Sequence, residues 1–504
     1  MNGRCKRMEK LYVAAMDLGG SGGKVQLGGY DGSRLEMRTA DRFRNESVRL
    51  LNEQYWDFLH ISDAFSKGLR SAAAGADGEI AALAATTFGH SVVLFDRAGR
   101  FFSQPYAVYP GRLDSAMKYV KERISPFDLH LRTGAEFRNY LTVVQLCAYL
   151  TNQEKQILDM ANSALLWPDA LNYVFGGEMC AERTAASVGG LYNLEKADWD
   201  VEIARRMGLN PQLMQPICES GHVLGEVRRD IRAAAGVRSK TKLVCAPGHD
   251  TASAIFAMPA EGAFISMGTM GLTGWTLDAP VANEYTFQEK MGNYALPENK
   301  NMLMTATRCM WYLERCRDAL CAAGAAKTYE EISAMAAARE GGRFLIDLND
   351  DAYLEQPENI MENIALYCSR TGQGEMNGAA DVLRCIFDSI AWAIVRSFRT
   401  FENVMGRMPE QVCVLGGGGR NAYLMQLIAD ALGAKLIVPE YEATSCGVLL
   451  SELIALGELS GAEQAKELVR RSVPIRTYAP QRSCDLTYAE RLYENIIPLR
   501  EALA

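Results

Sequence analysis

The segment DLGGSGGK at residues 17–24 has the composition of an anion-binding turn. Glycine lets backbone N–H groups approach an anion closely, and Ser21 and Lys24 add a hydrogen-bond donor and a positive charge. The segment is not a Walker A loop, because Leu18 stands where the first glycine would be and Val25 follows the lysine. We predict that this turn binds phosphate, and an ordinary tight hairpin is the alternative.

A second glycine-rich turn, SMGTMG at residues 266–271, offers Gly268, Thr269 and further glycine amides. Two phosphate-facing turns in one chain favour the binding of one nucleotide by both of them. Asp17, at the end of the strand before the first turn, is placed to hold Mg²⁺ through water, because Mg²⁺ keeps much of its hydration and takes one or two carboxylates. A turn-capping aspartate is the alternative for this residue.

The segment PGHDTASAIF at residues 247–256 follows an apolar strand that contains Leu243 and Val244 and begins a helix. Ligands of open α/β sheets bind at the carboxyl ends of strands, which is where this pattern brings Asp250. Asp250 is therefore a candidate general base. The alternative is an N-cap for a helix that starts at Thr251.

The segment VLGGGGRN at residues 414–421 is a strand followed by four glycines and a helix. Such a turn suits close approach of the backbone to an adenine ring or a phosphate. Neither this segment nor DLGGSGGK fits the G-x-G-x-x-G dinucleotide fingerprint.

Composition excludes several classes of protein. The chain has 504 residues, 48% of them hydrophobic and 23% charged, and a formal net charge of −8, so it is a globular protein without a broad basic surface for nucleic acid. No apolar run approaches the ~18 residues of a membrane-spanning helix. Its 13 cysteines contain no C-x-x-C pair and its 5 histidines have no metal-ligand spacing. We expect a cytoplasmic protein without a membrane or nucleic-acid partner and without a structural zinc.

Strands and helices alternate along the chain, which favours an α/β architecture of two or three domains. Residues 11–32 read as two strands around a glycine tip, and residues 262–277 repeat this design. The repeat suggests a duplicated fold with a ligand held between the copies. We predict one domain at 1–245, with the sugar site and the first phosphate hairpin, and a second at 246–504, with the nucleotide site and Asp250.

The segments DLGGSGGK, GHDTASA, SMGTMG and GGGGRN, in this order and at these separations, resemble the FGGY carbohydrate kinases. The segments NLEKADWD, GHVLGEV, YCSRTGQ, RCIFDSIA and EATSCGVLLSELIALGEL extend the resemblance to the rhamnulokinase branch, over about residues 11–480. The resemblance implies a duplicated actin-like ATPase (ribonuclease H-like) fold, with ATP and the sugar in a cleft between two domains. It also implies ATP and Mg²⁺ as cofactors and a small-molecule sugar as the partner, and it leaves the oligomeric state open.

The resemblance implies a role for each matching residue. Asp250 is the catalytic base and Asp17 lies near Mg²⁺. The residues implied at the ATP phosphates or elsewhere on the nucleotide are Gly20, Ser21, Gly22, Gly23, Lys24, Gly268, Thr269, Gly417 and Gly418. Those implied at the sugar are Gly89, His249, Asp250 and Thr251. Arg112, the matching basic residue of an altered segment, and His90 are further candidates for sugar contacts.

The chain departs from the branch pattern where the sugar is recognised. Residues 86–91 read TTFGHS where the branch usually has D-T-W-G-x-D, so two carboxylates are absent. Tyr109 and Pro110 replace an Arg-Asp pair, which leaves Arg112 as the matching basic residue, and Leu141 replaces an asparagine. On the nucleotide side, Ala306 and Glu314 stand where the branch usually has asparagine and glutamine. A packed or solvated side chain is the alternative to a sugar contact for His90.

These observations lead us to expect a kinase that transfers the γ-phosphate of ATP to a primary hydroxyl of a sugar, a ketose of the rhamnulose type. The alternatives are a kinase for another ketose or a polyol, and a catalytically weak sugar or nucleotide sensor on the same fold. Retention of Asp17 and Asp250 argues against the sensor, and the altered sugar segment argues for it. The resemblance also suggests that Cys368 and Cys385 lie close enough to form a disulfide on oxidation and so close a surface loop.

Overall fold

The computed structural model describes residues 10–109, 111–238, 240–325, 328–350 and 359–482, together with residues 490, 492 and 494. The chain forms two compact units that interleave along the sequence. The first comprises Met1–Ala260, Leu277–Leu303 and Tyr441–Val473, and the second comprises Glu261–Thr276, Met304–Glu440 and Pro474–Ala504. Each unit is assembled from three segments of the chain. The predicted single domain boundary near residue 245 stays a prediction.

A six-stranded mixed sheet forms the centre of the first unit, in the order β13-β14-β6-β1-β2-β3. Its strands are β1 (Leu11–Leu18), β2 (Gly22–Tyr30), β3 (Leu35–Arg44), β6 (Ile80–Thr87), β13 (Val223–Glu226) and β14 (Lys242–Val244). β1 and β2 form the predicted glycine-tipped hairpin, and β1 runs parallel to β6. The carboxyl ends of β1 and β6 therefore lie at one edge of the sheet, where Asp17 and the residues after Thr87 are found.

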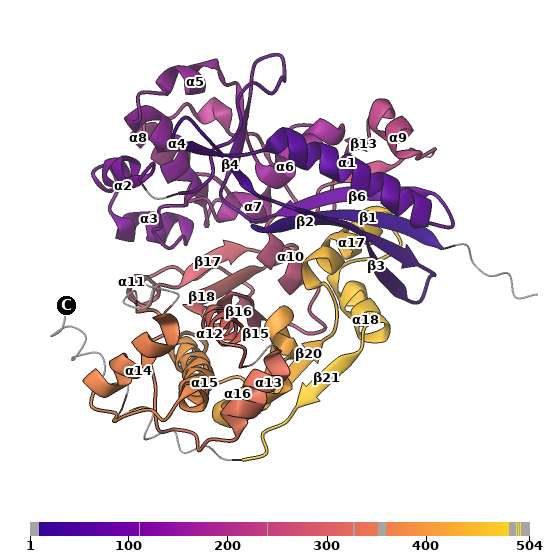
Figure 1. Ribbon diagram of the computed structural model, residues 1–504. Helices are drawn as coiled ribbons and strands as arrows, with labels where there is room; N and C mark the ends of the chain where they lie inside the picture. The colour runs from indigo at the N-terminus through magenta and orange to yellow at the C-terminus, as the bar shows by residue number, and fades with distance from the viewer. Residues whose placement is uncertain are drawn as a thin grey trace, which may run out of the picture. The chain divides into compact units, whose positions relative to one another are not determined.

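Apolar side chains cover both faces of this sheet. On one face, Ala14 and Met16 pack with α1 (Phe58–Gly75) and α6 (Trp167–Phe175). On the other face, Val13 and Ala15 pack with α17 (Ala443–Ala455) and α18 (Ala462–Ser472), and Figure 1 shows these two helix pairs on opposite sides of the strands. Because both faces are buried, β1 reads as a continuous apolar run instead of an alternating one. Residues of α17 and α18, which lie far from β1 in the sequence, thereby pack next to this strand.

Helices and short strands extend the first unit. The helices are α2 (Asp114–Lys121), α3 (Pro126–Thr133), α4 (Thr142–Thr151), α5 (Lys155–Met160), α7 (Arg183–Ser187), α8 (Val201–Arg206), α9 (Arg229–Ala235), α10 (Asp250–Phe256) and α11 (Glu284–Gln288). The strands are β4 (Ser47–Leu50), β5 (Glu53–Trp56), β7 (Val92–Phe95), β8 (Ser163–Leu166), β9 (Ala181–Glu182), β10 (Tyr192–Asn193), β11 (Asp198–Trp199), β12 (Ile217–Cys218) and β17 (Gly292–Ala295).

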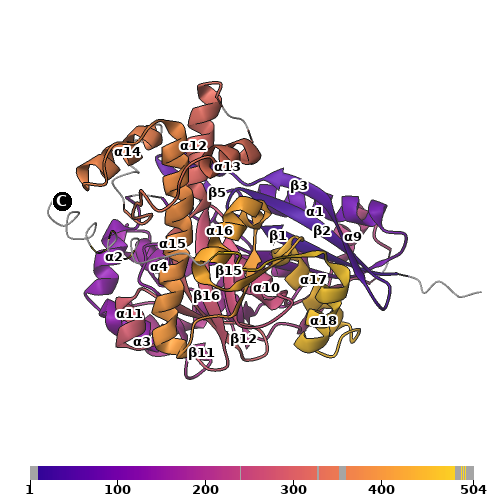
Figure 2. The ribbon, with the colours of Figure 1, turned by 90° about the horizontal axis from the view of Figure 1, so that it is seen from below.

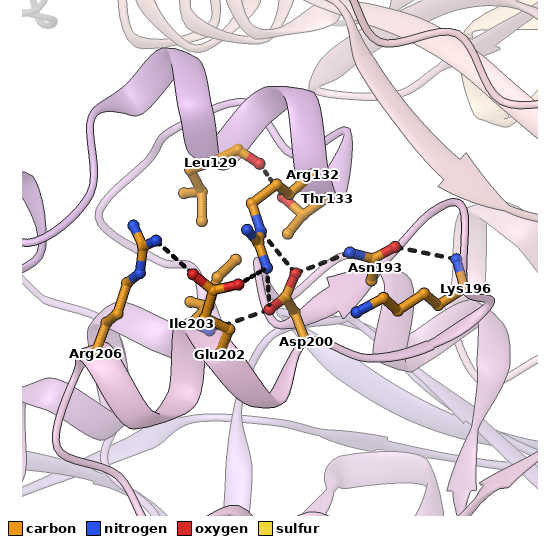
Figure 3. Close-up of polar contacts among 9 residues, drawn as sticks. All are labelled: Leu129, Arg132, Thr133, Asn193, Lys196, Asp200, Glu202, Ile203 and Arg206. Atoms are coloured by element: carbon orange, nitrogen blue, oxygen red, sulfur yellow. Dashed lines mark hydrogen bonds and ion pairs between the residues drawn. The ribbon is translucent and has the colours of Figure 1, made fainter.

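An ion-pair network ties α3 to the start of α8 (Figure 3). The guanidinium of Arg132 donates to both carboxylate oxygens of Asp200 at 2.8 Å and to Glu202 at 2.9 Å. Asp200 also caps α8 by accepting from the N–H of Ile203 at 3.1 Å. Burial acts to raise the pKa of Asp200, but the bonds from Arg132 and Asn193 outweigh it and lower the pKa. A helix start that is bonded bidentately to a neighbouring helix is a rigid support.

The second unit is built around a mixed sheet with the order β18-β16-β15-β19-β20-β21. Its strands are β15 (Ala263–Met267), β16 (Met270–Leu277), β18 (Asn301–Arg308), β19 (Gln411–Leu415), β20 (Lys435–Pro439) and β21 (Ile475–Tyr478). Its helices are α12 (Met310–Ala322), α13 (Tyr329–Ala337), α14 (Ile360–Arg370), α15 (Ala379–Met405) and α16 (Ala422–Leu432). Figure 2 shows the long helix α15 running past α16 and the strands of this unit.

The two sheets repeat one topology. In the first unit an antiparallel hairpin, β1–β2, is followed by the parallel strands β6 and β14. In the second unit the hairpin β15–β16 is followed by the parallel strands β19 and β20. The glycine-tipped repeat in the sequence therefore corresponds to a repeat of the whole sheet order, as the predicted α/β duplication requires.

Cys368 and Cys385 are both free thiols, and both are buried, on α14 and α15 of the second unit. Burial, together with the contact of the two thiols, raises the pKa of Cys385 well above its usual value. The two side chains are therefore close, as expected, but their burial places them inside the helix packing and not in a surface loop. Disulfide formation on oxidation stays a prediction.

No helix among the described residues is long and apolar enough to cross a membrane. In the same part of the chain, no group of three or more His, Cys, Asp or Glu side chains is arranged to hold a metal ion.

Glu452 on α17 is completely buried, and neither of its carboxylate oxygens has a hydrogen-bond partner among the described residues. Burial raises its pKa well above the usual 4.5. Because the folded state then binds a proton more tightly than the unfolded chain, stability should fall as the pH rises from about 4.5 through the folded-state pKa.

We expect Glu452→Met to stabilise the protein by about 1–3 kcal/mol at neutral pH. The substitution removes an unpaired buried carboxyl group and replaces it with an apolar side chain of similar length. Thermal unfolding of the parent and the variant at pH 6 and pH 9 measures the effect. The parent should lose more stability than the variant between these two pH values. An equal pH dependence in both proteins would show that Glu452 does not titrate as its burial implies.

Candidate active site

Hydrogen bonds to its backbone carbonyls hold the turn between β1 and β2, and the tip of the turn is exposed. The N–H of Gly19 donates to the Gly22 carbonyl at 2.8 Å. Asn45 bonds the same turn twice, through its N–H to the Ser21 carbonyl at 3.2 Å and through its amide to the Gly19 carbonyl at 3.0 Å. Gly20 and Ser21 are exposed. Their backbone N–H groups have no recorded partner in the described residues, so this turn can present them to an anion.

Lys24 lies opposite Asp17 in the β1–β2 register, and its side chain is engaged by two carboxylates. Its Nζ is 3.2 Å from Asp17 Oδ2 and 2.6 Å from Glu442 Oε2. Burial acts to lower the pKa of Lys24, but the charges of Asp17 and Glu442 outweigh it and raise the pKa. Lys24 is therefore an ammonium at neutral pH, held beside the glycine turn.

Asp17 is 5% exposed at the end of β1 and accepts a hydrogen bond from Ser445 Oγ at 2.6 Å on Oδ2. Burial raises its pKa more than Lys24 and Ser445 lower it, and the negative charge of Asp250 adds to the rise. Asp17, Lys24 and Asp250 thus lie within electrostatic reach of one another. The sequence predicted all three, and the first unit brings them together.

Asp250 is the first residue of α10, with His249 in the cap position. The N-cap alternative for a helix that starts at Thr251 is therefore wrong in its boundary, although Asp250 Oδ1 accepts from the Thr251 N–H at 2.6 Å and from its hydroxyl at 3.2 Å. Burial raises the pKa of Asp250 to about 6. A carboxylate with a pKa near 6 is ionised at neutral pH and is a better proton acceptor than an ordinary aspartate.

The imidazole of His249 lies beside Asp250, and that of His90 lies near His249. His249 Nε2 is 3.6 Å from Asp250 Oδ1, and burial lowers the pKa of His249 to about 4. Burial and the nearby His249 lower the pKa of His90 to about 3, so both rings are neutral at pH 7. In each ring Nδ1 is buried without a hydrogen-bond partner among the described residues. Such nitrogens can take part in hydrogen bonds with the hydroxyls of a ligand if the rings move.

Gly89 permits the close packing of this group, because a Cβ there would lie 2.7 Å from Val188 Cγ2 and 3.5 Å from the His249 ring. His90 has a positive φ of 81°, which is uncommon for a side chain of its size. Its carbonyl accepts from Thr142 Oγ1 at 2.6 Å and from Gln145 Nε2 at 3.2 Å, so the start of α4 holds this backbone conformation.

Aromatic rings surround the two histidines. The Tyr140 ring is 4.7 Å from the His90 ring, and the Tyr294 ring is 6.4 Å from the His249 ring. Neither tyrosine could be identified from the sequence, because each lies far along the chain from its histidine. These rings make the surroundings of His90 and His249 more apolar than the carboxylate-rich segment that the branch pattern implies.

The guanidinium of Arg112 contacts two carboxylates and an aromatic ring. It is 2.7 Å from Glu154 Oε2 and 3.1 Å from Glu53 Oε2, and it lies 3.2 Å above the Tyr106 ring. Tyr109 also bonds Glu53, and Pro110 lies outside the described residues. Two carboxylates already satisfy the positive charge of Arg112, so its role as a sugar contact stays a prediction.

Thr86 and Leu141, at two other altered positions, are buried within the protein. Thr86 is fully buried and donates to the Gly248 carbonyl at 3.2 Å. The hydroxyl of the adjacent Thr87, which matches the branch pattern, donates to the Phe88 carbonyl at 2.9 Å. Thr86 and Leu141 therefore do not replace the polar groups that the branch pattern has at the same positions.

The second unit contains a cavity of about 710 Å³ that brings together the predicted nucleotide-binding residues of this unit. Its walls include Gly268 and Thr269 from the β15–β16 turn, and Gly417 and Gly418 from the 3-10 helix Gly417–Arg420 that follows β19. A Cβ at Gly418 would lie 2.2 Å from Met267 Cγ, so the glycine is required for the turn to reach the hairpin. The volume falls in the range of small-molecule and cofactor sites.

Glu314 on α12 also lines this cavity, and Thr269 Oγ1 lies 3.4 Å from each of its carboxylate oxygens. Ala306, the other altered position, is exposed on β18. The remaining polar wall was not predicted from the sequence. It consists of Tyr329, Glu330, Ser333, Arg420, Asn421 and Tyr423.

The first unit fits a bound Mg²⁺ at Asp17. The recorded contacts of this carboxylate in the described residues use Oδ2, and a second carboxylate, Asp250, is close enough to raise the pKa of Asp17. One or two carboxylates with water are what Mg²⁺ takes when it is bound together with phosphates. The metal itself stays a prediction.

Glu182 is a further functional candidate that the sequence did not reveal. It is buried, and its Oε2 accepts from the Gly248 N–H at 2.9 Å and from Thr184 Oγ1 at 2.6 Å. Burial raises its pKa. Because Gly248 is two residues before Asp250, Glu182 fixes the loop that delivers the candidate base.

Comparison with known proteins agrees with this arrangement. Residues 12–257 match the N-terminal domain of the FGGY family of carbohydrate kinases, and residues 263–456 match the C-terminal domain of that family. The chain is 30% identical to a rhamnulokinase from Bacteroides thetaiotaomicron, over 94% of this chain and 96% of the relative. It is 29% identical to a rhamnulokinase from Oceanobacillus iheyensis, over 92% and 97% of the two chains.

Solved structures of similar fold include the gluconate kinase from Lactobacillus acidophilus, with a TM-score of 0.79 at 15% identity and 98% coverage of both chains. The Plasmodium falciparum glycerol kinase with ADP has a TM-score of 0.78 at 16% identity, with 98% of this chain and 99% of that chain covered. The predicted α/β fold class is confirmed. The predictions of family and of carbohydrate kinase activity are also confirmed: this chain belongs to the FGGY family of carbohydrate kinases.

Proposed function

We propose that the chain transfers the γ-phosphoryl group of ATP to a primary hydroxyl of a ketose related to rhamnulose. The observation that supports this most is Asp250, a partly buried carboxylate with a pKa of about 6 at the start of α10, beside Asp17 and Lys24. Its ionised form accepts the proton of the attacking hydroxyl.

The residues have separate tasks in this transfer. Gly20 and Ser21 offer backbone N–H groups, and Lys24 offers a positive charge, to the phosphate that is transferred. Thr269 and the glycine turns of the second unit bind the nucleotide. Bound Mg²⁺, held through Asp17, would neutralise phosphate charge. Phosphoryl transfer depends mainly on such positioning and charge stabilisation.

Another ketose or a polyol is the second candidate acceptor. It is favoured by residues 86–91, whose threonine hydroxyls bond backbone carbonyls, and by the neutral His90 and His249 with their tyrosine neighbours. This surface has fewer charged groups than the branch pattern. It suits an acceptor with fewer hydroxyls to recognise or with a more apolar side.

An assay that couples ADP release to a measured signal tests the proposal with a panel of sugars. Sugar-dependent ADP release, with the phosphate found on a primary hydroxyl by mass spectrometry and NMR, is the expected result. ADP release that does not depend on any sugar in the panel would contradict the proposed acceptor class.

Thr269→Val is expected to weaken ATP and ADP binding by about 10- to 100-fold, because a hydrogen bond to a charged group contributes roughly 1.5–3 kcal/mol. Titration calorimetry with ADP measures the change. The matched control is Thr276→Val, which removes a hydroxyl that bonds the Gly262 N–H at the other end of the same hairpin. Unchanged nucleotide affinity and turnover in Thr269→Val would show that the second hairpin does not bind the phosphates.

A further inference from the structure

The ammonium of Lys24 is held between two carboxylates that differ in exposure. The side chain of Asp17 is 7% exposed and that of Glu442 is 33% exposed. The shorter contact, 2.6 Å, is to the more exposed Glu442, while Asp17 is 3.2 Å away. A lysine side chain is flexible, so a partner at hydrogen-bond distance decides where the charge lies.

Glu442 immediately precedes α17, and the first turns of this helix contact the other groups of the site. Ser445 Oγ donates to Asp17 at 2.6 Å. Gly447 faces Ser253 of α10 so closely that a Cβ would lie 2.0 Å from the Ser253 carbonyl oxygen. Ser253 Oγ also donates to the Thr444 carbonyl at 2.8 Å. Residues 442–447 therefore fix Lys24 and Asp17 directly, and α10, which carries Asp250, by close packing.

We propose that Glu442 is a positioning residue for phosphoryl transfer, which competes with Asp17 for the Lys24 ammonium, draws it closer to itself and releases it to the phosphate that is transferred. This inference rests on the proposed function. Without Glu442, the nearest anion to Lys24 would be the buried Asp17, the carboxylate needed by Mg²⁺. With Glu442 present, the ammonium rests on a partly exposed anion that a phosphate can replace.

A purely stabilising role for Glu442 does not explain these contacts. Its other partner, Arg42, is 3.2 Å away and 62% exposed. Exposed ion pairs of this kind add little to stability. The geometry that distinguishes Glu442 is its contact with Lys24.

The first test compares three variants of the full-length protein. Glu442→Gln is expected to lower kcat/KM for ATP by about 10- to 100-fold, with little change in thermal stability or in KM for the acceptor. Glu442→Asp should recover part of this loss. The matched control, Glu463→Gln, removes the carboxylate of another ion pair, that with Lys466 on α18, and should leave the kinetics unchanged. Equal kinetics in Glu442→Gln and the parent would overturn the proposal.

A second test does not depend on turnover. The ¹³C chemical shift of Lys24 can be measured by NMR after reductive ¹³C-methylation of the lysines, with Lys24→Arg used to assign its signal. Because Glu442 Oε2 is the nearer carboxylate oxygen, at 2.6 Å, Glu442→Gln should shift this signal. An unchanged Lys24 signal would overturn the proposal. If the parent protein phosphorylated no sugar, the proposed function would fail, and this comparison would still decide whether Glu442 holds Lys24.

A double-mutant cycle measures whether Glu442 and Lys24 act together. If Glu442 acts through Lys24, then Glu442→Gln should cause little further loss of kcat/KM for ATP in a Lys24→Met background. Losses that multiply independently would show that Glu442 acts in another way.

Discussion

Asp250→Asn is expected to lower turnover by about 10²- to 10⁴-fold, which is the usual contribution of a positioned general base. Asparagine has nearly the same shape and can still accept a bond from the Thr251 N–H, which Asp250 accepts at 2.6 Å. The fold and nucleotide binding should therefore be retained. Steady-state kinetics with the best acceptor, together with calorimetry for ADP, measures both properties.

Asp114→Asn is the matched control, because Asp114 is also the first residue of a helix of the first unit, α2, and it is exposed. This variant should keep normal turnover. Near-normal turnover of Asp250→Asn would show that the assigned role of Asp250 is wrong.

The pH dependence gives a further check on the same residue. Since burial raises the pKa of Asp250 to about 6 and the ionised form is the active one, kcat/KM for the acceptor should fall as the pH decreases through about 6. His249 and His90 have lowered pKa values of about 4 and about 3, so they stay neutral across this range. A profile without a decrease near pH 6 would contradict the base assignment.

L-rhamnulose is expected to be a poor acceptor, with kcat/KM about two to four orders of magnitude below that of the preferred sugar. The branch pattern places charged or amide groups where this chain has Thr86, Ser91, Tyr109, Pro110 and Leu141. Loss of even two charged hydrogen bonds, at roughly 1.5–3 kcal/mol each, accounts for a change of this size.

The buried or bonded state of the described members of this set supports the expectation. Thr86 uses its hydroxyl on a backbone carbonyl and Leu141 is buried, so neither replaces a lost contact. A coupled ADP-release assay across L-rhamnulose, L-fuculose, L- and D-ribulose, L- and D-xylulose, D-fructose and glycerol measures the ranking. Efficient turnover of L-rhamnulose above all the others would show that these departures were misinterpreted.

Much of the fold followed from local patterns. The glycine tip of the first hairpin, the long apolar run of β1 and the repeat of both at residues 263–277 predicted strands that the structure contains. These signals are local, because a glycine turn and an apolar strand are specified within about ten residues. The boundary of α10 was misplaced by one residue, which is the usual uncertainty of a helix end.

The structure brings some of the predicted site residues together, and their roles stay predictions. Gly268, Thr269, Gly417 and Gly418 line one cavity, as their glycine-rich turns suggested. The resemblance to the rhamnulokinase branch suggests Arg112 as a sugar contact because of its charge and position in the sequence. It carries no information on Glu53 and Glu154, which bind the guanidinium of Arg112. Charge type can be read from a sequence, but the partner of a charge depends on packing.

The sequence by itself determined the α/β class, the family, the two glycine-rich turns and the candidate base, because each is recognised from short contiguous segments. Only the tertiary structure decided that Glu442 and Ser445, more than 400 residues from Lys24 and Asp17, contact them. It also decided that the neutral His90 and His249 lie near each other and that His249 lies beside Asp250. These pairings and the pKa values depend on burial and on distance through space, and neither quantity is a property of a sequence segment.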